Sequence, residues 1–145
     1  REEIKIMSQE DLITVMLVDD HDLVRVGYRM LLESYPGMTV VAEADDGESA
    51  CFQYGNVNPD VVVLDLSMPG IGGMETIRRL RAIDSATKIL VFSMHDSKLI
   101  VGRAIDAGAS GYLVKGSTAE KMVDAIRQVS AGNTYLNRDL PSDTG

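Results

Sequence analysis

Three aspartates that directly follow apolar runs are the residues of this sequence best suited to chemistry. Asp19 and Asp20 close the run at 13–18, and Asp65 closes the run at 61–64. A carboxylate at the tip of a buried strand is costly to hold unless a ligand or partner compensates it. Because the ligands offered here are oxygen atoms, a hard cation is favoured, Mg²⁺ or Mn²⁺. A divalent ion beside a free carboxylate indicates phosphoryl chemistry, with an acyl phosphate as the product.

Two further side chains follow predicted strands in the same way. Ser93 comes just after one apolar run and Lys115 just after another. The carboxyl ends of parallel strands meet at one edge of a sheet, so a hydroxyl and an ammonium are expected beside the acids. One lysine cannot offset three carboxylates, which repel near contact by about 4 kcal/mol at an effective dielectric of about 20. A raised pKa or a bound cation is therefore expected.

The elements that position these residues follow from periodicity. Short runs rich in β-branched residues predict five strands, at 13–18, 39–42, 61–64, 88–92 and 111–114. Apolar residues at helical spacing predict a helix after each strand, at about 23–35, 46–57, 72–80, 100–107 and 117–129. Ser117 to Glu120 has the pattern of a capping box, and Gly108 is well placed as a C-terminal cap. This alternation predicts a doubly wound α/β fold with one parallel sheet and helices on both faces.

Composition narrows the classes of function. The chain of 145 residues fits one domain, and its formal net charge of −8 argues against nucleic-acid binding by this segment itself. The single cysteine, Cys51, excludes an internal disulfide and suits a reducing compartment. No apolar stretch approaches the ~20 residues that span a bilayer, and the charged start lacks the apolar core of a signal peptide. We therefore expect a cytoplasmic protein that does not enter a membrane.

The sequence resembles the receiver domain of bacterial two-component response regulators, roughly from Ile13 to Ala131. The resemblance rests on these residues, in order: Asp19-Asp20, Asp65 with Met68-Pro69-Gly70, Ser93, Tyr112 and Lys115. Residues 93–96 and 107–116 look like the NarL/FixJ subfamily. The resemblance implies a flavodoxin-like (βα)5 fold with strand order 2-1-3-4-5. It also divides the chain into an extension or expression remnant at 1–12, a receiver domain at 13–131 and the start of an interdomain linker at 132–145.

The family's site residues carry over by position. The resemblance implies that Asp65 is the phosphoacceptor and receives its phosphoryl group from the phosphohistidine of a sensor histidine kinase. Asp20, Asp65 and the backbone carbonyl of Ser67 would ligate Mg²⁺, with Mn²⁺ as a possible substitute and Asp19 acting mainly through water. Lys115 would hold the phosphoryl group. Such a domain catalyses only its own phosphorylation and dephosphorylation, so we expect a signalling domain rather than an enzyme.

The output is also implied by the resemblance. Ser93 and Tyr112 would form a switch pair that responds to phosphorylation and changes the face made by the fourth helix, fifth strand and fifth helix. Homodimerisation and control of transcription would follow, with DNA bound only through a C-terminal helix-turn-helix domain that this chain lacks. The alternative is a stand-alone receiver that acts as a phosphorelay or adaptor. Many receivers have proline after the lysine; here it is Gly116, so no cis bond is predicted.

Other interpretations compete with this one. A Mg²⁺-dependent phosphatase or mutase would need a second acid at the position of Ser67 and a cap domain, for which there is no room. A nucleotide-binding fold would need a glycine-rich turn after the first strand, where Asp19 and Asp20 stand instead. A degenerate receiver would lack part of the site.

Single residues also have simpler interpretations. Taken alone, Asp19 and Asp20 could cap a helix, and Tyr112 could simply pack in the core. His21 is not expected to ligate Mg²⁺, which prefers oxygen, and Ser67 and His95 are expected to flank the phosphoryl site.

Overall fold

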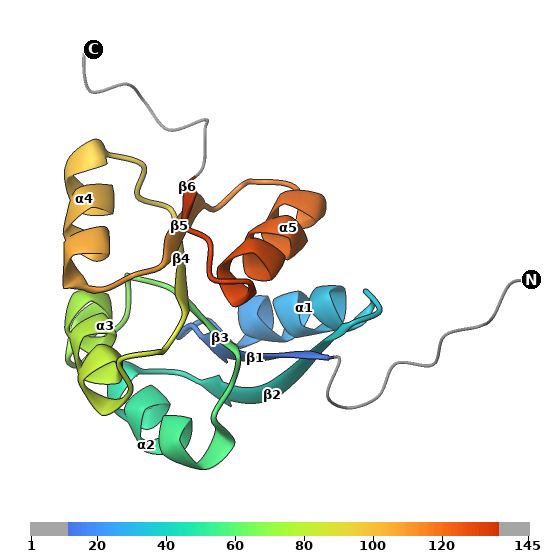
Figure 1. Ribbon diagram of the computed structural model, residues 1–145, viewed down its shortest axis with the longest axis horizontal. Coiled ribbons are helices and arrows are strands. Elements are labelled where there is room, and N and C mark those ends of the chain that lie inside the picture. The colour runs from blue at the N-terminus through green and yellow to red at the C-terminus, as the bar shows by residue number, and fades with distance from the viewer. Residues whose placement is uncertain (1–11, 137–145) are drawn as a thin grey trace, which may run out of the picture.

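Six parallel strands form one sheet in the computed structural model, which describes residues 12–136. The strands run in the spatial order β2-β1-β3-β4-β5-β6 (Figure 1). Their bounds are β1 Ile13–Val18, β2 Met38–Ala44, β3 Val61–Leu64, β4 Ile89–Ser93, β5 Gly111–Val114 and β6 Tyr135–Leu136. The helices between them are α1 Asp22–Glu33, α2 Gly47–Val57, α3 Gly72–Ile83, α4 Lys98–Ala107 and α5 Ala119–Ser130.

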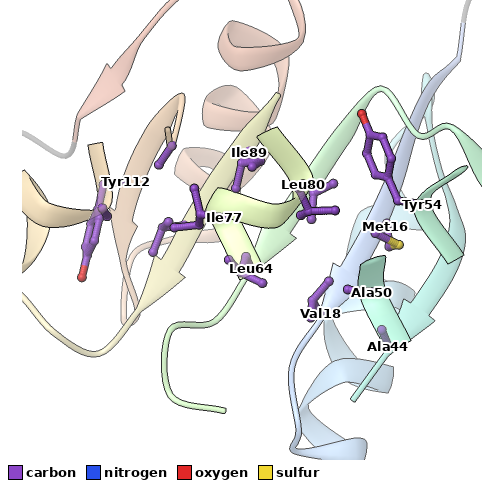
Figure 2. Close-up of a cluster of buried hydrophobic side chains, with 14 of the residues drawn as sticks. Met16, Val18, Ala44, Ala50, Tyr54, Leu64, Ile77, Leu80, Ile89 and Tyr112 are labelled. Carbon is purple, nitrogen blue, oxygen red and sulfur yellow. The ribbon is translucent and has the colours of Figure 1, made fainter. Parts of the chain in front are cut away.

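Helices cover both faces of the sheet. α1 and α5 lie on one face, and α2, α3 and α4 lie on the other (Figure 1). Every residue of β3 is buried, as expected for a parallel strand covered on two sides. On the α2–α4 face, Ile77 and Leu80 of α3 belong to a buried cluster that has Tyr112 at one end and Tyr54 at the other (Figure 2). On the opposite face, Leu32 of α1 packs with the apolar side of α5.

The predicted α/β architecture is confirmed, but the count of five strands is wrong. The first five strands have the expected order, and β6 extends the sheet by pairing with β5, Gly111 opposite Tyr135. The approach is close, since a Cβ on Gly111 would lie 2.8 Å from the Tyr135 carbonyl oxygen. A two-residue strand is too short to show a periodic pattern, so the sequence suggested a linker there. Residues 1–11 and 137–145, which hold most of the predicted extension and linker, lie outside the described residues.

The ends of the helices test the capping predictions. Gly108 is the C-cap of α4 with φ 122°, a conformation that favours glycine, and α1 ends at Glu33, before Pro36. The capping box predicted at Ser117 is wrong. Thr118 is the N-cap of α5, and its hydroxyl accepts from the Lys121 backbone N–H. The Ser117 hydroxyl instead donates to the Val114 carbonyl at 2.7 Å. Serine and threonine are both preferred at N-caps, and the path of the loop decides between them.

Strand order reverses between β1 and β3, which places their carboxyl ends side by side. Val18 and Leu64 are direct partners in the ladder, and the Asp65 backbone N–H donates to the Val18 carbonyl at 2.9 Å. Ligands bind at such switch points in doubly wound sheets, because two loops diverge there and leave a crevice. In the described part of the chain, no helix is both long enough and apolar enough to cross a bilayer.

Candidate functional site

Three strands bring one lysine and two aspartates into direct contact. The Lys115 ammonium lies 3.1 Å from Oδ2 of Asp65 and 3.2 Å from Oδ2 of Asp19. The side chains of Asp19 and Asp65 are only 8% and 5% exposed, and that of Lys115 is 12% exposed. Asp20, which follows Asp19, is more open, with 32% of its side chain exposed. We call these four residues the acid pocket. The sequence predicted that they converge, and the structure confirms it.

Burial and pairing act in opposite directions on the charges of the acid pocket. Burial would raise the pKa of Asp19, but hydrogen bonds from the backbone and ring of His21 and from Lys115 outweigh it, so this pKa is lowered. Burial would likewise lower the pKa of Lys115, but the charge of Asp65 and its hydrogen bonds with both aspartates leave this pKa raised. Asp19 and Lys115 are therefore both held in their charged forms at neutral pH.

The acid pocket has the donor set of a hard-cation site. Potential ligand atoms of Asp19, Asp20, His21 and Asp65 all lie within 4.8 Å of one another. Oδ1 of Asp20 is buried and has no hydrogen-bond partner among the described residues, although Nδ1 of His21 lies 3.1 Å away. An orphaned carboxylate oxygen in an excess of negative charge is what a bound cation would compensate. The residues present therefore fit Mg²⁺.

The alternative that the two acids serve as helix caps is not supported. The N-cap of α1 is His21, and its side chain makes no capping hydrogen bond. Oδ1 of Asp19 instead accepts from the His21 backbone N–H at 2.9 Å, and the His21 ring nitrogen lies 3.1 Å from the same oxygen. Ligand atoms of both acids also lie within 4.8 Å of those of Asp65, so both acids face the pocket. The His21 ring stands at its edge, 61% exposed.

The loop after β3 contributes backbone to the site. The Ser67 N–H donates to Oδ1 of Asp65 at 3.1 Å, so both oxygens of the predicted phosphoacceptor are engaged. Gly73, at the start of α3, donates to the Leu66 carbonyl at 3.3 Å and closes this loop. The metal-ligand role of the Ser67 carbonyl and the water-mediated role of Asp19 stay predictions.

The predicted switch residues are buried and share a partner, His95. The Ser93 hydroxyl accepts from the His95 backbone N–H at 3.1 Å, and the Tyr112 hydroxyl donates to the His95 carbonyl at 2.7 Å. Both side chains have no exposed surface. The His95 ring also lies 3.3 Å from Oγ of Ser67. Burial raises the pKa of Tyr112, and the charges of Asp65 and Asp96 act in the same direction. His95 thus connects the loop after Asp65 with both predicted switch residues.

One residue of the site was missed by the sequence analysis. Arg25, on the first turns of α1, donates to the backbone carbonyl of Asp19 and to the carboxylates of Asp22 and Glu43. An arginine on an amphipathic helix is usually a solvated charge, so nothing in the sequence distinguished it. Its role depends on Glu43 in β2, which only the folded sheet brings near.

A protein-family model described as the response regulator receiver domain matches residues 15–127. The chain belongs to this family. Among its relatives, the response regulator UvrY of Escherichia coli (strain K12) is 42% identical over 129 residues, covering 89% of this chain and 59% of UvrY. The response regulator GacA of Pseudomonas aeruginosa is 43% identical over 129 residues, covering 89% of this chain and 60% of GacA. The receiver domain described here therefore spans about three-fifths of the length of these relatives.

Solved structures agree with this assignment. A two-component response regulator of the LuxR family from Aurantimonas sp. SI85-9A1 superposes with a TM-score of 0.86 at 45% identity, covering 89% of this chain and 92% of that one. The signal receiver domain of the putative response regulator NarL from Mycobacterium tuberculosis superposes with a TM-score of 0.81 at 36% identity. The match covers 85% of this chain and 99% of that one. The predicted resemblance to the NarL/FixJ subfamily is confirmed by these relatives of the receiver domain.

Proposed function

We propose that this receiver domain accepts a phosphoryl group on Asp65 from the phosphohistidine of a sensor histidine kinase, in a Mg²⁺-dependent reaction. The observation that carries the proposal is the position of Asp65. Its carboxylate is 5% exposed, lies 3.1 Å from Lys115 and shares a cluster of potential cation ligands spanning 4.8 Å with Asp19 and Asp20. Catalysis at such a site consists mostly of positioning and charge neutralisation.

The chemistry assigns a separate task to each side chain. An oxygen of the Asp65 carboxylate attacks phosphorus, the P–N bond to the donor imidazole breaks, and the bonding electrons leave with the imidazole nitrogen. Lys115 donates to a phosphoryl oxygen and stabilises its charge, and the Ser93 hydroxyl donates to another. When bound, Mg²⁺ would neutralise further charge on the phosphoryl oxygens, held by Asp20, Asp65 and the Ser67 carbonyl, with Asp19 acting through water.

The output follows from the same site. Rotation of Ser93 toward the phosphoryl group would release the His95 backbone N–H, which now donates to Ser93. Tyr112 is held by the same residue through the His95 carbonyl, so the two predicted switch side chains are linked before any phosphoryl group arrives. A two-state element biased by a local charge is the usual form of such a switch.

We further propose that the switch controls dimerisation and a DNA-binding domain that acts in transcription, in the cytoplasm. The relatives that carry this part of the proposal are response regulators about two-thirds longer than the matched region. A stand-alone receiver that works as a phosphorelay or adaptor is the alternative. An enzyme acting on a separate phosphorylated substrate is less well supported, because Ser67 stands where such an enzyme needs its second acid.

The test is phosphorylation of the chain by a small acyl phosphate, followed by intact-mass spectrometry. With Mg²⁺ we expect the mass of one added phosphoryl group, and with EDTA none. Asp65→Asn should prevent the addition, whereas Asp124→Asn, a matched change at an exposed aspartate on α5, should not. A phosphoryl group retained by Asp65→Asn would reject Asp65 as the acceptor.

A further inference from the structure

Arg25 connects three segments around the acid pocket. Its side chain is 13% exposed, and its guanidinium donates through Nε to Glu43 at 2.9 Å and through Nη2 to Asp22 at 3.0 Å. Nη1 donates to the backbone carbonyl of Asp19. Arg25 also lines a small cavity beneath the pocket, together with Asp19 and Asp65. One planar fork of donors therefore joins the end of β1, the start of α1 and the strand β2.

The contact with the Asp19 carbonyl bears on two of the predicted cation ligands. The carbonyl of Asp19 and the N–H of Asp20 belong to one planar peptide unit. Holding that carbonyl oxygen limits rotation of the whole plane, and the plane sets the direction in which the Asp20 side chain leaves the backbone. The Asp19 N–H is held independently by the Ala44 carbonyl at 3.0 Å. Arg25 thus holds the one peptide plane from which both carboxylates project.

The charge of Arg25 is balanced by carboxylates outside the acid pocket. Arg25 and Arg29 face Glu43, and Asp22 completes the group, so two positive and two negative side chains balance. The carboxylate of Asp19 is paired with Lys115 and His21, not with Arg25. The influence of Arg25 on the acid pocket is therefore geometric, through the backbone.

We propose that Arg25 is a positioning residue of the cation site, which pre-organises Asp19 and Asp20 for Mg²⁺ by holding the peptide plane between them. This inference rests on the proposed function, since it takes the acid pocket as the Mg²⁺ site. Side chains that orient metal ligands without touching the metal typically change its affinity by about 10–100-fold when they are removed. The alternative is a purely structural arginine that only ties α1 to β2.

Arg29 provides a matched control for that alternative. Its Nη1 donates to the other oxygen of Glu43 at 2.7 Å, from the next turn of the same helix. Among the described contacts it does not reach Asp19. Arg25→Ala and Arg29→Ala each remove an arginine–Glu43 ion pair between α1 and β2. Arg25→Ala also removes the ion pair with the exposed Asp22 and frees the Asp19 carbonyl.

The experiment measures Mg²⁺ affinity by isothermal titration calorimetry, with thermal unfolding in EDTA as the measure of metal-free stability. We expect Arg25→Ala to weaken Mg²⁺ binding about tenfold and Arg29→Ala to leave it close to that of the unmodified chain. In phosphorylation by a small acyl phosphate, Arg25→Ala should raise the Mg²⁺ concentration for half-maximal labelling while the plateau at saturating Mg²⁺ is kept. Equal Mg²⁺ affinities for the two variants would overturn the proposal.

A second variant covers the case in which Arg25→Ala does not fold. Arg25→Lys keeps the charge but replaces the planar fork by a single ammonium, and we expect Mg²⁺ binding several-fold weaker than in the unmodified chain. If Arg25→Lys bound Mg²⁺ as tightly as the unmodified chain, the inference would be overturned. If the unmodified chain binds Mg²⁺ and is phosphorylated, such a result rejects only the role of Arg25. If the unmodified chain binds no Mg²⁺, the metal part of the proposed function fails as well.

Discussion

Lys115 faces Asp19 and Asp65 with a single positive charge, and this imbalance is the main electrostatic property of the site. Asp20 adds a third carboxylate whose buried Oδ1 has no hydrogen-bond partner among the described residues. The negative charge of these three carboxylates is poorly compensated in the metal-free protein. It is suited to binding a dication and, afterwards, a phosphoryl group whose negative charge Lys115 can share.

Replacing Lys115 should therefore destabilise the metal-free protein. We expect Lys115→Met to lower the free energy of unfolding at pH 7 in EDTA by about 2 kcal/mol, because two buried carboxylates lose their cation. Saturating Mg²⁺ should narrow the difference, since a bound dication replaces the lost charge. Urea unfolding of the unmodified chain and of Lys115→Met, with and without Mg²⁺, measures the difference in stability. Lys88→Met is the control, because Lys88 lies just before β4, at the other end of the sheet. Equal stabilities in EDTA would contradict the prediction.

The contact between Asp19 and Lys115 makes the free energy of unfolding depend on pH. The pKa of Asp19 is lowered from 3.8, so its stabilising contribution is present above that value and is lost as pH falls through the lower pKa of the folded state. The pKa of Lys115 is raised from 10.5, so its contribution is present below that value and is lost as pH rises through its folded-state pKa. The deficit of Lys115→Met should therefore be largest between these limits and shrink in acid. A deficit that grows below pH 3.8 in urea unfolding would be inconsistent with this assignment.

At the scale of elements, the loop from β3 to α3 depends on a close approach at Gly73. A Cβ there would lie 2.5 Å from the Leu66 Cα and 2.9 Å from its carbonyl oxygen. These are backbone atoms of the residue that follows Asp65, so they cannot move without moving the site. Glycine at this position lets α3 begin directly against the loop that follows Asp65.

Gly73→Ala should therefore affect both stability and chemistry. We expect a loss of about 1–3 kcal/mol in the free energy of unfolding and slower labelling of Asp65 by a small acyl phosphate. Gly102→Ala is the matched control, because Gly102 lies within α4 with no heavy atom within 4 Å of a built Cβ. Alanine in an exposed helix should stabilise the protein by about 1 kcal/mol. Chemical denaturation and intact-mass time courses decide, and unchanged labelling in Gly73→Ala would show that the loop tolerates the shift.

At the scale of the whole molecule, the site at the carboxyl ends of the strands lies close to the surface formed on the α4 side. The α4 side carries exposed apolar side chains, Met94 and Leu99, which are 72% and 64% exposed. Met94 directly precedes His95, which contacts both predicted switch residues, and Leu99 follows on α4. A change at Ser93 and Tyr112 therefore has a short path to this surface.

We expect phosphorylation to promote dimerisation through the α4 side. Sedimentation velocity with a small acyl phosphate and Mg²⁺ should give a higher mass than without them, and Asp65→Asn should not respond. Leu99→Asp should weaken the dimer, whereas Phe52→Asp, at a 79% exposed position on α2, should not. The same mass with and without phosphorylation would count against dimerisation. If Leu99→Asp and Phe52→Asp weakened the dimer equally, the α4 side would not be the dimer face.

The parallel sheet explains why so much could be predicted. Apolar runs without alternation indicated strands buried on both faces, and β1, β3 and β5 have the predicted bounds. The exceptions are features in which local sequence is ambiguous or silent. β6 is two residues long, two neighbouring hydroxyl residues competed for the cap of α5, and Arg25 looks like any helical surface arginine. For β6 and Arg25 a contact distant in sequence made the choice, and at the cap of α5 the path of the loop after β5 made it.

Sequence alone determined the types of side chain at the strand ends, and with them the chemistry that we propose for this chain. It also determined which ends meet, because parallel strands align their carboxyl ends. The folded molecule added the depth and contacts of the site: Lys115 reaches Asp65 across 50 positions and Asp19 across 96, and Arg25 reaches Glu43 across 18. Such contacts depend on strand register and helix packing, which arise from many weak interactions together and are not specified by any short stretch of sequence.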